Sequence, residues 1–70
     1  MKVEERLAYH EYEVVLWNGL VQKVEAAASE IDRGTLVFRG RSTSGGIGGI
    51  IGAFAPGTWA RHEWKRNLGR

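Results

Sequence analysis

The sequence contains no cysteine among its 70 residues and a single proline, Pro56. Without cysteine the chain forms no disulfide bond and offers no thiolate ligand to zinc. A cysteine-free composition fits a reducing compartment. The N-terminus, whose charges begin at Lys2, lacks the uninterrupted apolar stretch of a secretory signal. We therefore expect a cytoplasmic protein.

Long apolar runs and catalytic side chains are also scarce. The longest apolar run, residues 45–55, has eleven residues, whereas a helix needs about 20 to cross a bilayer. His10 and His62 are the only histidines, and neither is followed by a second histidine at metalloprotease spacing. Each has a glutamate beside it, but adjacent residues of a strand point to opposite faces. We expect no membrane span, no enzymatic activity, no metal site and no cofactor.

Charged residues are plentiful, and they are sorted along the chain. Residues 1–32 carry seven acids and three bases, a net charge of −4, whereas residues 33–70 carry seven bases and one acid, a net charge of +6. A one-sided field attracts anions, or docks the basic half of one copy onto the acidic half of another. The pattern predicts a binding surface rather than a reaction.

The length predicts one small domain, residues 1–70, with a basic C-terminal tail at 65–70. The chain is 43% hydrophobic and 26% charged, as in folded globular proteins. A domain of this size buries only about 60% of the surface that its unfolded chain exposes. Because no disulfide adds stability, we expect further burial against a second copy, in a homo-oligomer.

The clearest local signal is Asn18-Gly19 between two β-rich segments, residues 10–17 and 20–26. Asn-Gly in this setting is typical of a two-residue type I′ turn, which needs positive φ at both residues. The pattern predicts a β-hairpin. A two-residue loop places Tyr12 opposite Glu25.

A helix over residues 20–33 is the rival interpretation of the same region. Asn18 would cap it, Gly34 would end it, and the three consecutive alanines at 26–28 favour it. In either case a turn follows at residues 32–34.

The second half of the chain predicts further strands. Residues 35–39 form a strand between two glycines, and residues 40–46 form a polar, flexible loop. Residues 47–55 are apolar and form a strand whose glycines permit close approach of another backbone. Residues 58–68 form a last strand or, in the alternative, a C-terminal helix. This segment contains Trp59 and Trp64, and we expect at least one of these two tryptophans to pack in the core.

Together these segments predict an all-β fold. We expect a small antiparallel meander of about five strands, curled or closed into a half-open barrel. The alternative is an α+β fold with a helix at 20–33 or at the C-terminus.

The polar loop has the features of an anion site, because glycine frees backbone N–H groups and guanidinium groups suit phosphate. The chain matches neither the Walker pattern nor the dinucleotide fingerprint, and an ordinary hairpin connection is the simpler interpretation. The candidate ligand residues are Arg39, Arg41, Ser42, Ser44, Gly45 and Gly46.

A second candidate group lies in the C-terminal stretch, where cations alternate with aromatic residues. Such a mixture binds single-stranded nucleic acid by charge and by stacking. The candidates are Arg61, Trp64, Lys65 and Arg66.

These features predict a non-enzymatic binding protein, a homo-oligomer whose basic second half engages the phosphate of a nucleotide or nucleic acid. The alternative is a protein–protein interaction module, an adaptor or inhibitor with a larger protein partner. The small size also fits a phage or mobile-element counter-defence product that acts by sequestration.

Overall fold

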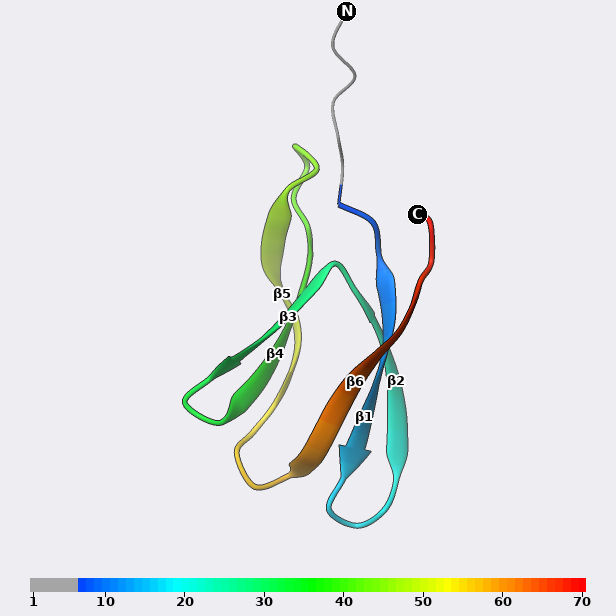
Figure 1. Ribbon diagram of the computed structural model, residues 1–70. Coiled ribbons are helices and arrows are strands. Elements are labelled where there is room, and N and C mark those ends of the chain that lie inside the picture. Colours follow the sequence, from blue (N-terminus) through cyan, green and yellow to red (C-terminus); the bar gives the residue numbers. More distant parts are fainter. Residues whose placement is uncertain (1–6) are drawn as a thin grey trace, which may run out of the picture.

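A computed structural model describes residues 7–70 and shows six antiparallel strands (Figure 1). They are β1 (His10–Leu16), β2 (Val21–Ala26), β3 (Ala28–Asp32), β4 (Thr35–Arg41), β5 (Ile47–Phe54) and β6 (Trp59–Asn67). The all-β prediction is confirmed, and both helical alternatives are wrong. Residues 7–70 contain no helix that is long and apolar enough to cross a membrane. The charges at Lys2, Glu4, Glu5 and Arg6, and the segment on which the prediction about a secretory signal rests, lie outside the described residues.

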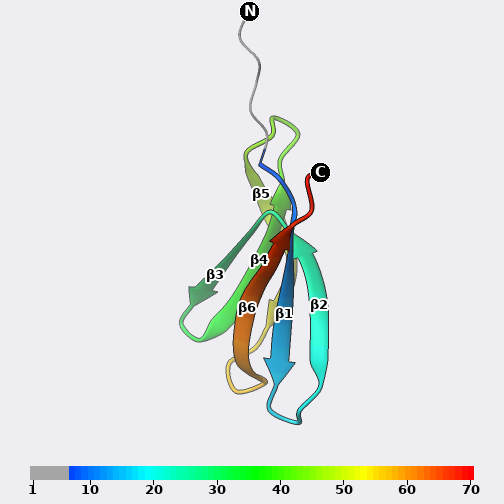
Figure 2. The ribbon, with the colours of Figure 1, turned by 45° about the vertical axis from the view of Figure 1, so that its right-hand side comes forward.

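The strands form two three-stranded sheets, in the orders β2-β1-β6 and β3-β4-β5. The sheets face each other, as Figure 2 shows, and do not close into a barrel. The chain passes between them twice, from β2 to β3 and from β5 to β6. Strand β3 is the element that the sequence analysis missed.

The alanines at 26–28 mark the first crossing between the sheets. Ala26 pairs with His10 in one sheet, and Ala28 pairs with Arg39 in the other. Ala27 lies between them, is buried, and donates its N–H to the carbonyl oxygen of Arg39 at 2.8 Å. The helix propensity of alanine is overridden here by tertiary packing, because Ala26 and Ala27 are buried where the strand passes into the second sheet.

The β1–β2 hairpin exists, but its predicted turn type and register are wrong. The Gly19 N–H donates to the Leu16 carbonyl at 2.9 Å, and the Leu16 N–H donates to the Leu20 carbonyl at 2.8 Å. Gly19 has φ +90°, whereas Asn18 has no positive φ. These bonds define a three-residue loop, a type I turn followed by a left-handed glycine.

The extra loop residue shifts the strand pairing by one position. Tyr12 pairs with Val24 instead of Glu25, and Glu25 pairs with Glu11. Tyr12 is buried and Val24 is half-buried against the same core. The observed register therefore keeps apolar side chains on one face and carboxylates on the other.

The type I′ turn occurs instead between β3 and β4. Asp32 pairs with Thr35, and the two residues between them both have positive φ: Arg33 at 52° and Gly34 at 86°. The predicted turn at residues 32–34 is confirmed.

The core lies between the two sheets and is small. Its fully packed members are Tyr12, Val14, Ala26, Leu36 and Phe38. Trp59 packs against this cluster and is half-buried, as the sequence predicts for one tryptophan. Trp17 and Trp64 are exposed, at 70% and 56%.

Candidate binding surfaces

The predicted ligand loop is the tip of the β4–β5 hairpin. It is shorter than expected, because Gly40 and Arg41 belong to β4. The Gly45 N–H donates to the Ser42 carbonyl at 3.0 Å, and the Ser42 N–H donates to the Gly46 carbonyl at 2.8 Å. The hydroxyls of Ser42 and Ser44 lie 2.9 Å apart and bond to each other. The hairpin itself therefore uses the N–H groups of Ser42 and Gly45 and one of the two serine hydroxyl protons, all of which were predicted to be available to an anion.

The two arginines of β4 are both anchored on their own chain. Arg39 forms an ion pair with Glu30 of β3, and its Nη1 donates to the Gly48 carbonyl at 3.3 Å. The Arg41 guanidinium lies over the Tyr9 ring, 4.7 Å from its centroid, and donates to the Leu7 carbonyl at 3.1 Å. Cation–π contacts of this kind hold a guanidinium group without neutralising its charge.

The segment before β1 ties this tip to the C-terminal end. The Leu7 N–H donates to the Gly45 carbonyl at 2.8 Å, and the Tyr9 N–H donates to the Arg70 carbonyl at 2.6 Å. The Tyr9 hydroxyl accepts the Arg41 N–H at 3.2 Å. The β4–β5 loop and the C-terminus accordingly lie at the same end of the molecule, the upper end in Figure 1.

The second candidate group lies on β6, in the other sheet. Lys65 pairs with Glu13 at 3.6 Å, and Arg66 pairs with Glu11 at 3.3 Å. The Trp64 indole N–H donates to Nδ1 of His10 at 3.1 Å. The described ion pairs of residues 7–70 do not involve the fourth candidate, Arg61.

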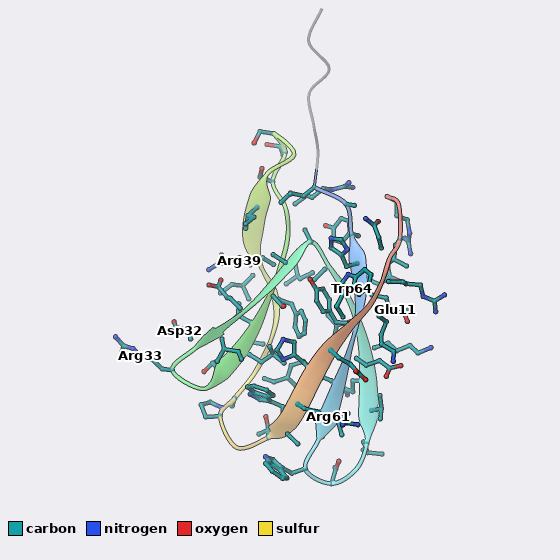
Figure 3. The ribbon with its side chains drawn as sticks, viewed as in Figure 1. Glu11, Asp32, Arg33, Arg39, Arg61 and Trp64 are labelled. Atoms are coloured by element: carbon teal, nitrogen blue, oxygen red, sulfur yellow. The ribbon has the colours of Figure 1, made fainter. Side chains whose placement is uncertain are left out.

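The separation of charge along the sequence is not a separation in space. Four of the five described ion pairs join the acidic half of the chain to the basic half. The reason is topological, since β6 pairs with β1 and β4 pairs with β3. Figure 3 shows Arg33, Arg39 and Arg61 on different parts of the molecule. The fold thus places Arg41 alone at the β4–β5 tip, and it groups Arg61, Lys65 and Arg66 along β6.

An apolar surface on β5 is the feature that the site predictions missed. Ile47, Ile50 and Ile51 are 60%, 58% and 55% exposed. Strand β5 is an edge of its sheet, paired with β4 on one side only. Of the six strands it alone carries no charged side chain. Its composition was visible in the sequence, but its edge position was not.

A smaller apolar patch lies at the β1–β2 turn, at the opposite end from the β4–β5 tip (Figure 1). Its members are Trp17, Leu20 and Val21, each more than half exposed. Within residues 7–70, no three His, Asp or Glu side chains are placed to hold a metal ion.

Comparisons with models of protein families, with curated proteins and with solved structures found no match.

Proposed function

We propose that this chain is a non-enzymatic binding protein that acts through protein–protein contacts, an adaptor or an inhibitor by sequestration. The observation that carries the proposal is the β5 edge, where three isoleucines are more than half exposed on an uncharged strand. An open edge offers unpaired N–H and C=O groups to another strand, and apolar side chains beside it add buried area.

The charges favour this proposal over a phosphate site. Arg39, Lys65 and Arg66 each pair with a glutamate of the same chain. A ligand phosphate would compete with these carboxylates, while a protein strand at β5 would displace none of them. Exposed apolar patches on small proteins mark interaction sites more often than isolated apolar residues do.

A photo-crosslinking amino acid at position 50 tests the proposal in an extract of the source cells. We expect discrete adducts from position 50 that an excess of unlabelled chain suppresses. The control is the same group at Glu63, an exposed position on β6 among ion pairs. Adducts of equal yield from both positions, or none from position 50, would contradict the proposal.

Anion binding is the second candidate, and Arg41 is the observation that favours it. Among residues 7–70 its guanidinium contacts a ring and a carbonyl oxygen but no carboxylate, so its charge is not neutralised there. Arg41 directly precedes Ser42 in the chain, at the start of the loop that carries the Ser42 and Ser44 hydroxyls. Nucleotide and heparin titrations of the wild type and of Arg41→Ala test this candidate, with Arg33→Ala as the control. If Arg41→Ala leaves nucleotide and heparin binding unchanged, the β4–β5 tip is ruled out as the anion site.

Single-stranded nucleic acid on β6 remains part of the same candidate. Trp64 is exposed and Arg61 has no described ion pair, so a base and a phosphate would meet them first. Salt-sensitive DNA binding that Trp64→Ala weakens would support it. The cytosol remains the proposed compartment, based on the cysteine-free composition.

A further inference from the structure

The single chain has a small core for its length. The buried cluster holds only five residues. A domain below about 70–80 residues without disulfide or metal commonly gains stability by oligomerising. A second copy is the partner that is always present at matching concentration.

The edge strands differ in how well they pair with their own copy. In antiparallel self-pairing, a strand lies beside the same strand of a second copy. Like charges that are clustered on the strand then lie opposite each other. Strand β3 carries Glu30 and Asp32 and would repel its copy. Strand β6 centred on Glu63 would place Arg61 opposite Lys65. Strand β2 carries one charge of each sign, Lys23 and Glu25, which self-pairing centred on Val24 would place opposite each other, but it has only 6 residues against the 8 of β5.

Strand β5 carries no charged side chain, so no like charges would lie opposite each other in a β5–β5 pair. It also has eight residues, enough for a stable ladder. It also has no proline, the residue that most directly blocks an edge. A Cβ at Gly49 or Gly52 would meet no atom within 4 Å. This open space beside the isoleucines is available to side chains of an incoming strand.

We propose that two copies of this chain pair through β5, antiparallel and related by a two-fold axis. The pairing joins the two β3-β4-β5 sheets into one six-stranded sheet and covers Ile47, Ile50 and Ile51 of both copies. The inference rests on the proposed function, because it names a second copy of the chain, in place of a larger protein, as the partner that occupies the β5 surface. A two-fold axis makes this interface closed, so the assembly stops at a dimer.

Sedimentation equilibrium of the purified full chain tests the dimer. We expect a dimer at micromolar concentration, and at least a tenfold weaker association for Ile50→Lys, which places two like charges at the centre of the interface. The matched control is Val21→Lys, an exposed β-branched residue on edge strand β2 at 54% exposure. This control keeps the wild-type association. A wild type that is monomeric at 100 times that concentration, or an Ile50→Lys variant that dimerises as tightly, overturns the inference.

Disulfide trapping gives a second measurement that does not depend on the lysine variant folding. Because the chain has no cysteine, single-cysteine variants at positions 49, 50, 51 and 52 report only the contact that they create. Opposed residues of an antiparallel pair have Cβ atoms about 4.5–5.5 Å apart, close enough for a disulfide. We expect a covalent dimer from at least one of these positions and none from Val21→Cys. Failure at all four positions overturns the inference.

The two experiments separate this inference from the proposed function. If the pure chain is monomeric while position 50 cross-links to a different protein in extract, the dimer is wrong and the interaction module stands. If the chain is monomeric and position 50 yields no adduct, both are wrong.

Discussion

The indole N–H of Trp59 donates a hydrogen bond of 3.0 Å to the backbone carbonyl oxygen of Gly34. Trp59 begins β6 in one sheet, and Gly34 belongs to the turn between β3 and β4 of the other. The bond therefore joins the two sheets at one end of the core, where the Trp59 ring also packs.

Replacing Trp59 by Phe removes this bond and leaves the Gly34 carbonyl without its partner. We expect the free energy of unfolding to fall by about 1–2 kcal/mol, the cost of a lost hydrogen bond and of some buried area. Urea denaturation followed by circular dichroism measures it. Trp64→Phe is the control, because its indole bonds to His10 at an exposed site, and it should change stability by no more than about 0.5 kcal/mol. An equal loss of stability in Trp59→Phe and Trp64→Phe would show that Trp59 does not join the sheets.

Gly48 and Gly49 form a matched pair for testing backbone approach. A Cβ at Gly48 would lie 2.6 Å from the carbonyl carbon of Arg41 and 2.7 Å from its oxygen, whereas one at Gly49 meets nothing within 4 Å. Gly48→Ala must push the β4 backbone away, and we expect it to cost about 2 kcal/mol or more. Gly49→Ala should change stability by no more than about 0.5 kcal/mol. Thermal unfolding of both variants decides, and a Gly48→Ala variant as stable as Gly49→Ala would contradict the close approach.

Leu36→Ala tests the small core. Leu36 is fully buried in the cluster between the two sheets, whereas Leu20 in the β1–β2 turn is 61% exposed. Truncating a buried leucine costs about 2–5 kcal/mol. Because a domain of this size has little stability to lose, we expect Leu36→Ala to be largely unfolded at 25 °C and Leu20→Ala to remain folded. Dispersed NMR amide signals from Leu36→Ala would refute this core assignment.

Arg33 tests the β3–β4 turn. It is the one residue other than glycine with a positive φ in residues 7–70, at 52°. Asparagine tolerates this conformation and is favoured in type I′ turns, whereas a β-branched residue is strained there. We expect Arg33→Asn to raise the free energy of unfolding by about 0.5 kcal/mol and Arg33→Val to lower it by about 1 kcal/mol. Urea unfolding that shows a loss of stability for Arg33→Asn and a gain for Arg33→Val would contradict the turn assignment.

The hairpins show which parts of the fold follow from local sequence. Asn18-Gly19 marked a turn, but the turn has three residues and its register differs by one from the prediction. The rule for the two-residue loop considers only the turn, whereas burial of Tyr12 with Val24 favours the longer loop. The type I′ geometry appears at Arg33-Gly34, where the turn was predicted without its type.

In the candidate sites, too, the local sequence reveals some features and not others. Their residues on β4 and β6 were recognisable by chemical type, but the glutamates that pair with Arg39, Lys65 and Arg66 come from β1 and β3, apart from Glu63, a second partner of Lys65 on β6. No pattern within the basic half of the chain reveals these partners. The exposed edge of β5 likewise depends on which strands lie beside it.

The sequence by itself favoured the all-β class over its helical alternatives, and it located most of the turns and every extended segment except β3. These features follow from local sterics, since β-branched residues favour extended backbone and glycine permits positive φ. Only the tertiary structure decided the strand register, the crossing at Ala27, the neutralisation of opposite charges and the exposure of the β5 isoleucines. Those depend on contacts between residues far apart in the chain, which form wherever the two sheets bury the most apolar area together.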